Sequence, residues 1–135
     1  GQGIVLLEDR HSLTPEEFPQ ARDLLGSLGV VETVSTSQMG IAGTISGCGP
    51  AYAAMFLEAL GDAGVLHGLP RDVSYRLAAQ MLAGTGKLYL AEENHPGAMK
   101  DAVCSPGGTT IRGVDALERH GFRSAVLDAI TAASR

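Results

Sequence analysis

The feature that most limits how this chain can fold is the absence of any charged side chain between residues 33 and 57. The stretch is not apolar enough to cross a membrane, because four glycines, Pro50 and several Ser and Thr side chains interrupt it. Its second half predicts a helix that begins at Pro50, whose only charges, Glu58 and Asp62, lie one turn apart on one face. Such a helix needs burial on most of its sides.

A single small bundle cannot easily surround this helix, because the helical region of the chain is only about 100 residues long. We therefore expect a homodimer in which a second copy covers the helix. The alternative is a monomeric bundle with this helix at its centre.

The chain alternates strand and helix before it becomes helical. Apolar runs at residues 4–7 and 30–34 predict two strands. Between them, residues 14–17 (Thr-Pro-Glu-Glu) provide a capping hydroxyl, a proline for the first helical position and a carboxylate three residues after the cap. Gly29 is expected to end this helix. Because two strands and one helix do not form a stable sheet alone, we interpret residues 1–37, which begin without Met, as a fragment of a larger α/β domain.

After residue 37 the pattern predicts helices only, so the predicted fold class is mainly α. Residues 69–72 (Leu-Pro-Arg-Asp) open a helix of roughly 20 residues. Its apolar stripe consists of Val73, Leu77, Met81, Thr85 and Leu88. Pro96 starts a short helix, and two more helices follow, divided at residues 120–122. We expect residues 38–135 to form one helical-bundle domain.

Composition and charge exclude several classes of function. The 135 residues are 44% hydrophobic, which is normal for a globular chain with a core. The net charge is −5 and the ten Lys and Arg are scattered, so neither nucleic acid nor a membrane is expected as a partner. Cys48 and Cys104 have no partner spacing, which fits a reducing cytoplasm and a role as small core residues. The four histidines show no paired spacing, so no metal is expected.

One glycine motif superficially resembles a dinucleotide-binding loop. Gly47, Cys48 and Gly49 begin the pattern, but Tyr52 stands at the third glycine position and no strand with β-branched residues precedes it. A tight helix junction with close backbone packing explains these glycines better.

The most informative motif is Ser-Pro-Gly-Gly-Thr-Thr at residues 105–110, called the Ser105–Thr110 loop below. Its two glycines allow successive N–H groups to face one concavity. Thr109 can cap the helix that follows, so that the positive helix end faces a bound anion. The same sequence is also typical of an ordinary turn.

Other polar residues are weaker indications of a functional site. Glu92 and Glu93 end the long helix, where carboxylates oppose the helix dipole, although solvated surface glutamates are the ordinary case. Lys100 and Asp101 are expected to be a surface pair rather than catalytic groups. The spacing supports no Ser-His-Asp or Cys-His arrangement.

Four motifs in this order resemble the pyrroline-5-carboxylate reductase family. They are Ser46 to Tyr52, Asp62 to Val65 with Gly68-Leu69-Pro70, His95-Pro96 with Lys100-Asp101, and Ser105 to Thr110 followed by Gly121-Phe122-Arg123. The resemblance covers essentially the whole chain. It implies a helical dimerisation domain from about Met39 onward and, before it, the last strand, helix and strand of a Rossmann-like cofactor domain.

The resemblance implies an NAD(P)H-dependent imine oxidoreductase that makes L-proline by hydride transfer to C5 of 1-pyrroline-5-carboxylate. The cofactor would be NADPH or NADH, and the active site would lie at a dimer interface of intertwined helices. The substrate-binding residues would be Ser105, Gly107, Gly108, Thr109, Thr110 and Glu93. The loop N–H groups and the Ser105 hydroxyl would hold the substrate carboxylate. Thr110, the catalytic residue, would meet the ring nitrogen, and Glu93 would approach from the other subunit.

Two departures from the family pattern limit this hypothesis. Cys48 stands where the family usually has serine. The Gly-rich half that carries most of the cofactor site is not in this sequence, so the cofactor-binding residues are unknown and we do not expect this chain to turn over alone. The alternative function is a non-catalytic helical dimerisation or anion-binding module of a reductase homologue. Assembly beyond a dimer also stays open.

Overall fold

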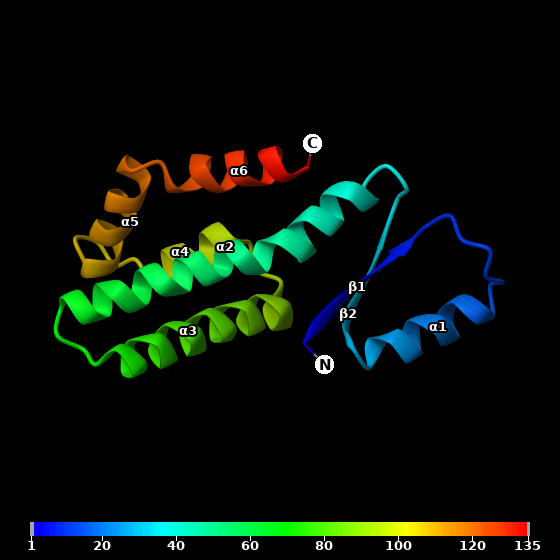
Figure 1. Ribbon diagram of the computed structural model, residues 1–135, viewed down its shortest axis with the longest axis horizontal. Helices are drawn as coiled ribbons and strands as arrows, with labels where there is room; N and C mark the ends of the chain where they lie inside the picture. Colours follow the sequence, from blue (N-terminus) through cyan, green and yellow to red (C-terminus); the bar gives the residue numbers. More distant parts are fainter. Residues whose placement is uncertain (1, 135) are drawn as a thin grey trace. The chain divides into compact units, whose positions relative to one another are not determined.

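The computed structural model describes residues 2–134, which form two strands and six helices. Helices make up most of this part of the chain, so the fold is mainly α, as predicted (Figure 1). The chain divides into two compact units, one of Gly1–Pro50 with Ala129–Arg135 and one of Ala51–Asp128.

The first unit contains the predicted β–α–β arrangement. Strand β1 (Gly3–Glu8) pairs in parallel with β2 (Gly29–Val34), and α1 (Glu17–Gly26) connects them. Gly3 lies opposite Gly29 in the register, and a Cβ on Gly29 would stand 1.9 Å from the Gly3 carbonyl oxygen. The prediction that Gly29 ends the helix is therefore wrong. The close approach of the two strands requires glycine at the first residue of β2.

The predicted capping hydrogen bonds at residues 14–17 are present, but α1 begins at Glu17, with Glu16 as its N-cap, rather than at Pro15. The Thr14 N–H donates to Glu17 Oε2 at 2.8 Å, and the Glu17 N–H donates to Thr14 Oγ1 at 3.2 Å. Two backbone donors that the helix cannot satisfy itself are thereby paired with side chains.

Five helices follow the second strand. They are α2 (Met39–Leu66), α3 (Arg71–Glu92), α4 (Pro96–Ala102), α5 (Thr109–Arg119) and α6 (Phe122–Ala133). The predicted starts near Pro70 and at Pro96 and the division at residues 120–122 are confirmed. No helix within residues 2–134 combines the length and apolar character needed to cross a membrane.

Helix α2 differs from the prediction at its start. It begins at Met39, and Pro50 lies inside it instead of opening it. A proline removes one hydrogen bond from a helix interior, yet α2 continues through Pro50 to Leu66. The predicted junction at Gly47 and Gly49 is also wrong, because both lie within α2 and a Cβ on either would meet nothing within 4 Å.

Helices α2 and α3 approach each other closely in the second unit (Figure 1). A Cβ on Gly61 would stand 2.2 Å from Tyr75 Cε1, and one on Gly64 would stand 2.3 Å from Ser74 Oγ. Ser74 is buried at this contact. The predicted apolar stripe of α3, by contrast, is largely exposed in a single copy of the chain, where Leu77 is 58% exposed.

Candidate functional site

The Ser105–Thr110 loop is a tight turn that leads directly into α5. The Gly108 N–H donates to the Ser105 carbonyl oxygen at 3.0 Å, which closes a four-residue turn. Pro106 occupies the second position of the turn, and Gly107 occupies the third with φ +67°. This is the pattern of a type II turn, in which the third residue takes a left-handed conformation that glycine adopts without strain.

Gly108 is required in this loop for a different reason. A Cβ at this position would stand 2.4 Å from Ser105 Oγ and 3.1 Å from the Ser105 carbonyl oxygen. The backbone of Gly108 has φ −71°, which any residue can adopt. Space, rather than backbone conformation, therefore selects glycine here, and the space is taken by the Ser105 hydroxyl.

The helix start differs from the prediction by one residue. Gly108, with an extended backbone, is the N-cap of α5, and Thr109 is the first helical residue. The expectation that Thr109 caps the helix is thus wrong, because the type II turn places the extended residue at Gly108. Helix α5 therefore begins without a side-chain cap and without an acidic residue in its first turn. Its first N–H groups, those of Thr109 and Thr110 included, are left to other acceptors, such as an anion.

Glu93 has an unusual backbone at the end of α3. It is the C-cap residue with φ 50° and ψ 25°, and its N–H donates to the Tyr89 carbonyl oxygen at 2.7 Å. Within residues 2–134 it is the one residue other than glycine with a positive φ. This left-handed conformation costs about 1–2 kcal/mol for a residue with a Cβ. No sequence pattern predicts that a glutamate would adopt it.

A single copy of the chain does not bring all predicted site residues together. Ser105, Gly107, Gly108, Thr109 and Thr110 share the loop and the first turn of α5. Glu93 lies at the end of α3, and Figure 1 shows that this end and the start of α5 are well separated, with α4 running between them. Glu93 therefore does not reach the loop of its own chain.

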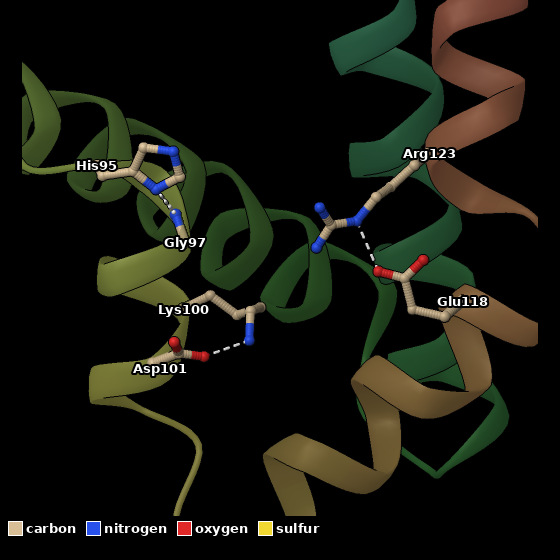
Figure 2. Close-up of polar contacts among 6 residues, drawn as sticks. All are labelled: His95, Gly97, Lys100, Asp101, Glu118 and Arg123. Atoms are coloured by element: carbon tan, nitrogen blue, oxygen red, sulfur yellow. Dashed lines mark hydrogen bonds and ion pairs between the residues drawn. The ribbon is translucent and has the colours of Figure 1, made fainter.

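A second group of polar residues surrounds a cavity of about 420 Å³ between α4, α5 and α6. It is lined by His95, Lys100, Glu118 and Arg123 and by apolar residues that include Leu117 and Phe122. Figure 2 shows that the charged side chains are already paired: Lys100 Nζ contacts Asp101 Oδ1, and Arg123 Nε donates to Glu118 Oε1 at 2.6 Å. The predicted Lys100–Asp101 pair is thus confirmed.

The environment of Lys100 favours its charged form. The hydrogen bond to Asp101 raises the pKa of Lys100 above its ordinary value, and partial desolvation and the nearby charge of Arg123 oppose this rise. In the same cluster, His95 Nδ1 accepts a hydrogen bond from the Gly97 N–H at 3.0 Å and caps α4 (Figure 2). These contacts organise the α4 region, but they leave little free charge for a ligand.

The described residues contain neither a metal cluster nor a dinucleotide loop. Among residues 2–134, no three His, Cys, Asp or Glu side chains are grouped to hold a metal ion. Cys48 and Cys104 are free thiols and half-buried rather than fully buried. Residues 9–16, which follow β1, and residues 35–38, which follow β2, contain no glycine. The described residues therefore supply no Gly-rich loop after a strand to hold the pyrophosphate of a nicotinamide cofactor.

The fold and the loop together define a mainly helical domain that follows the end of an α/β unit. A family model described as pyrroline-5-carboxylate reductase dimerisation matches residues 36–135. The chain belongs to this family.

Curated relatives from distant organisms agree with this assignment. The chain is 51% identical over 132 residues to a pyrroline-5-carboxylate reductase of Treponema pallidum, with 98% of this chain and 50% of the relative covered. It is 43% identical over 135 residues to the reductase of Synechocystis, with 100% and 51% covered. The chain thus spans about half the length of the curated relatives it matches.

Solved structures confirm the predicted fold class. A pyrroline-5-carboxylate reductase from Coxiella burnetii matches with a TM-score of 0.90 and 29% identity, over 97% of this chain and 49% of that chain. A Plasmodium falciparum pyrroline carboxylate reductase with NADP bound matches with a TM-score of 0.80 and 34% identity, over 93% and 50%. The family resemblance predicted from the four sequence motifs is confirmed as well.

Proposed function

We propose that this chain is the helical, substrate-binding part of a cytoplasmic pyrroline-5-carboxylate reductase, which reduces 1-pyrroline-5-carboxylate to L-proline. The observation that carries this proposal is the Ser105–Thr110 loop, where a hydroxyl lies over a glycine at the uncapped start of α5. A small carboxylate fits such a site because the helix end supplies both N–H donors and positive potential.

The loop holds the carboxylate of the substrate in this proposal. The donors are the Ser105 hydroxyl and the backbone N–H groups of Gly107, Thr109 and Thr110, because the Gly108 N–H already donates to the Ser105 carbonyl oxygen. Hydrogen bonds to a charged group contribute about 1.5–3 kcal/mol each, so three of them fix a substrate of this size. Because the carboxylate is held at the helix start, the imine ring lies against the first turn of α5.

Thr110 and Glu93 act on the ring in this proposal. Thr110 is exposed in the first turn of α5, so its hydroxyl meets the ring nitrogen when the carboxylate is in the loop. Glu93 comes from a second copy, since the end of α3 is distant from the loop of its own chain, and its carboxylate supports the positive charge of the protonated imine. NADPH or NADH supplies the hydride when bound to the cofactor domain. The residues of this chain bind and orient the imine.

A homodimer is part of the proposal. Large apolar side chains of α3 are exposed in one copy, including Leu77 and Leu90, which are 58% and 61% exposed. A second copy would cover them. We assign residues 38–135 to the dimerisation and substrate-binding domain and residues 1–37 to the end of the cofactor domain. Sedimentation of the chain as a monodisperse monomer would contradict the dimer.

The test of catalysis joins this chain to the cofactor-binding half of the Treponema pallidum relative and follows NADPH absorbance with 1-pyrroline-5-carboxylate. Thr110→Ala is expected to lower kcat by about tenfold to 100-fold, because one donor to the reacting nitrogen is lost. Thr85→Ala removes a hydroxyl that bonds only within α3 and serves as the control. Unchanged kinetics of Thr110→Ala would exclude the proposed role.

The second candidate is a non-catalytic dimerisation or anion-binding module. It requires only features that this chain carries, namely the uncapped start of α5 and the exposed apolar side chains of α3, and no nucleotide-binding residues. The two candidate functions predict different results for the protein in which this chain is joined to a cofactor-binding half. Binding of L-proline without any turnover would support the module, and turnover that depends on Thr110 would support the reductase.

A further inference from the structure

Arg112 lies beside the Ser105–Thr110 loop and bonds to it. It is the fourth residue of α5, and its Nε donates to the carbonyl oxygen of Gly108 at 3.2 Å. Gly108 is the N-cap of the helix. The guanidinium group therefore reaches back along the first turn to the residue that separates the loop from the helix.

Among the arginines of residues 38–134, Arg112 is the one without a carboxylate partner. The pairs are Arg71 with Asp62, Arg76 with Asp72, Arg119 with Asp115, and Arg123 with Glu118. Within residues 2–134, Arg112 forms no such ion pair, and the first turn of α5 contains no acidic residue. An unpaired positive charge near a helix N-terminus interacts unfavourably with the helix dipole. When an anion binds at the loop, the charge of Arg112 attracts it, so the same charge becomes stabilising.

The hydrogen bond to Gly108 also controls a donor of the loop. The Gly108 carbonyl and the Thr109 N–H belong to one planar trans peptide unit, so they point in opposite directions. A side chain that holds the Gly108 oxygen on the helix side therefore keeps the Thr109 N–H directed away from the helix, toward the loop.

We propose that Arg112 is a positioning residue for small carboxylate ligands at the Ser105–Thr110 loop, an inference that rests on the proposed function of that loop. Arg112 acts through the Gly108–Thr109 peptide and through its unpaired charge, and it need not touch the ligand. The ligand class is a compact monocarboxylate such as a cyclic amino acid. The nearby pair of Arg119 and Asp115 has no comparable role, because its charges already compensate each other.

The experiment is a titration of the 135-residue chain with L-proline, followed by backbone amide NMR shifts. Arg112→Ala is expected to raise Kd about fivefold and to flatten its salt dependence, because a hydrogen bond and a charge are lost. Arg112→Lys keeps the charge without the Nε hydrogen bond. Its Kd should therefore lie between those of the unsubstituted chain and Arg112→Ala, and it should keep the salt dependence of the unsubstituted chain. Arg119→Ala should leave Kd unchanged.

Two further readouts separate positioning from a merely structural role. Arg112→Ala should not lower the thermal stability of the chain, because alanine favours helix and an unfavourable charge is removed. Pyrrolidine lacks the carboxylate, so it should bind equally weakly to the unsubstituted chain and to all variants. An unchanged Kd in Arg112→Ala would overturn this inference alone. If L-proline shifted no amide of the loop even in the unsubstituted chain, both this inference and the proposed carboxylate site would be overturned.

Discussion

The hydroxyl oxygen of Ser105 lies 2.4 Å from the point at which a Cβ on Gly108 would stand. The same two residues are joined by the hydrogen bond from the Gly108 N–H to the Ser105 carbonyl oxygen at 3.0 Å. The two glycines of the loop are thus required for different physical reasons. Gly107 provides a left-handed backbone, and Gly108 leaves room for a hydroxyl.

Gly108→Ala should displace the Ser105 hydroxyl and leave the fold intact. The added methyl group collides mainly with a side chain that can rotate away, and its 3.1 Å contact with the Ser105 carbonyl oxygen is relieved by a small shift of the turn. The stability cost is therefore small, and the loss falls on ligand binding. We expect Gly108→Ala and Ser105→Ala each to weaken L-proline binding about tenfold, the value of one charge-assisted hydrogen bond. In a double-mutant cycle the two losses should not add. Additive losses would show that Gly108 has a role apart from the hydroxyl.

Gly107→Ala should instead destabilise the chain. Its φ of +67° is strained for alanine, so the free energy of unfolding should fall by about 1–2 kcal/mol. Gly113 lies inside α5, and a Cβ added to it would meet nothing within 4 Å. Gly113→Ala should therefore raise stability by about 0.5–1 kcal/mol. Urea unfolding of both variants measures the difference. Equal stabilities would contradict the turn geometry.

Local sequence rules predicted much of the fold. The Thr14 and Glu17 spacing specified a capping box, and the structure contains both of its hydrogen bonds. Pro96 marked a helix start because its missing N–H costs nothing in the first turn. The same rule failed at Pro50, because a proline is also tolerated inside a long helix, and propensity alone cannot separate the two cases.

The site was only partly readable from sequence. The loop was found because its glycines and hydroxyls are adjacent in the chain. The N-cap was misplaced by one residue, since Gly108 rather than Thr109 takes the extended backbone. The left-handed conformation of Glu93 and the bond from Arg112 to Gly108 gave no sequence signal, because both depend on how the backbone turns at a helix end.

Removing the capping box should loosen α1 locally. Thr14→Ala leaves the Glu17 N–H without its side-chain acceptor and should cost about 1 kcal/mol. Glu17→Gln keeps the shape and a weaker reciprocal bond, so its cost should be smaller. Amide hydrogen exchange in residues 17–26 reports this directly. Unchanged exchange in Thr14→Ala would mean that the cap contributes nothing in solution.

The pKa of Lys100 should respond in opposite directions to its two charged neighbours. Asp101→Asn removes the main cause of the raised pKa and should lower it, whereas Arg123→Ala removes a repelling charge and should raise it further. NMR titration of the Lys100 side chain above pH 9 measures both. Because the folded-state pKa is the higher one, the stabilisation is complete below the unfolded pKa of about 10.4 and is lost as pH rises through the folded value. A shift of the same sign in both variants would contradict the arrangement in Figure 2.

The contact of Gly61 with Tyr75 makes the strongest stability prediction. A Cβ on Gly61 would stand 2.2 Å from Tyr75 Cε1, and the ring cannot move freely because Arg71 Nη1 donates to the Tyr75 hydroxyl at 3.0 Å. Gly61→Ala should therefore force α2 and α3 apart and lower the free energy of unfolding by about 1–3 kcal/mol. Tyr75→Ala removes the obstacle, so in the double variant Gly61→Ala should cost little or even stabilise α2 through helix propensity. If Gly61→Ala were equally destabilising with and without the Tyr75 ring, the close approach of the two helices would not be its cause.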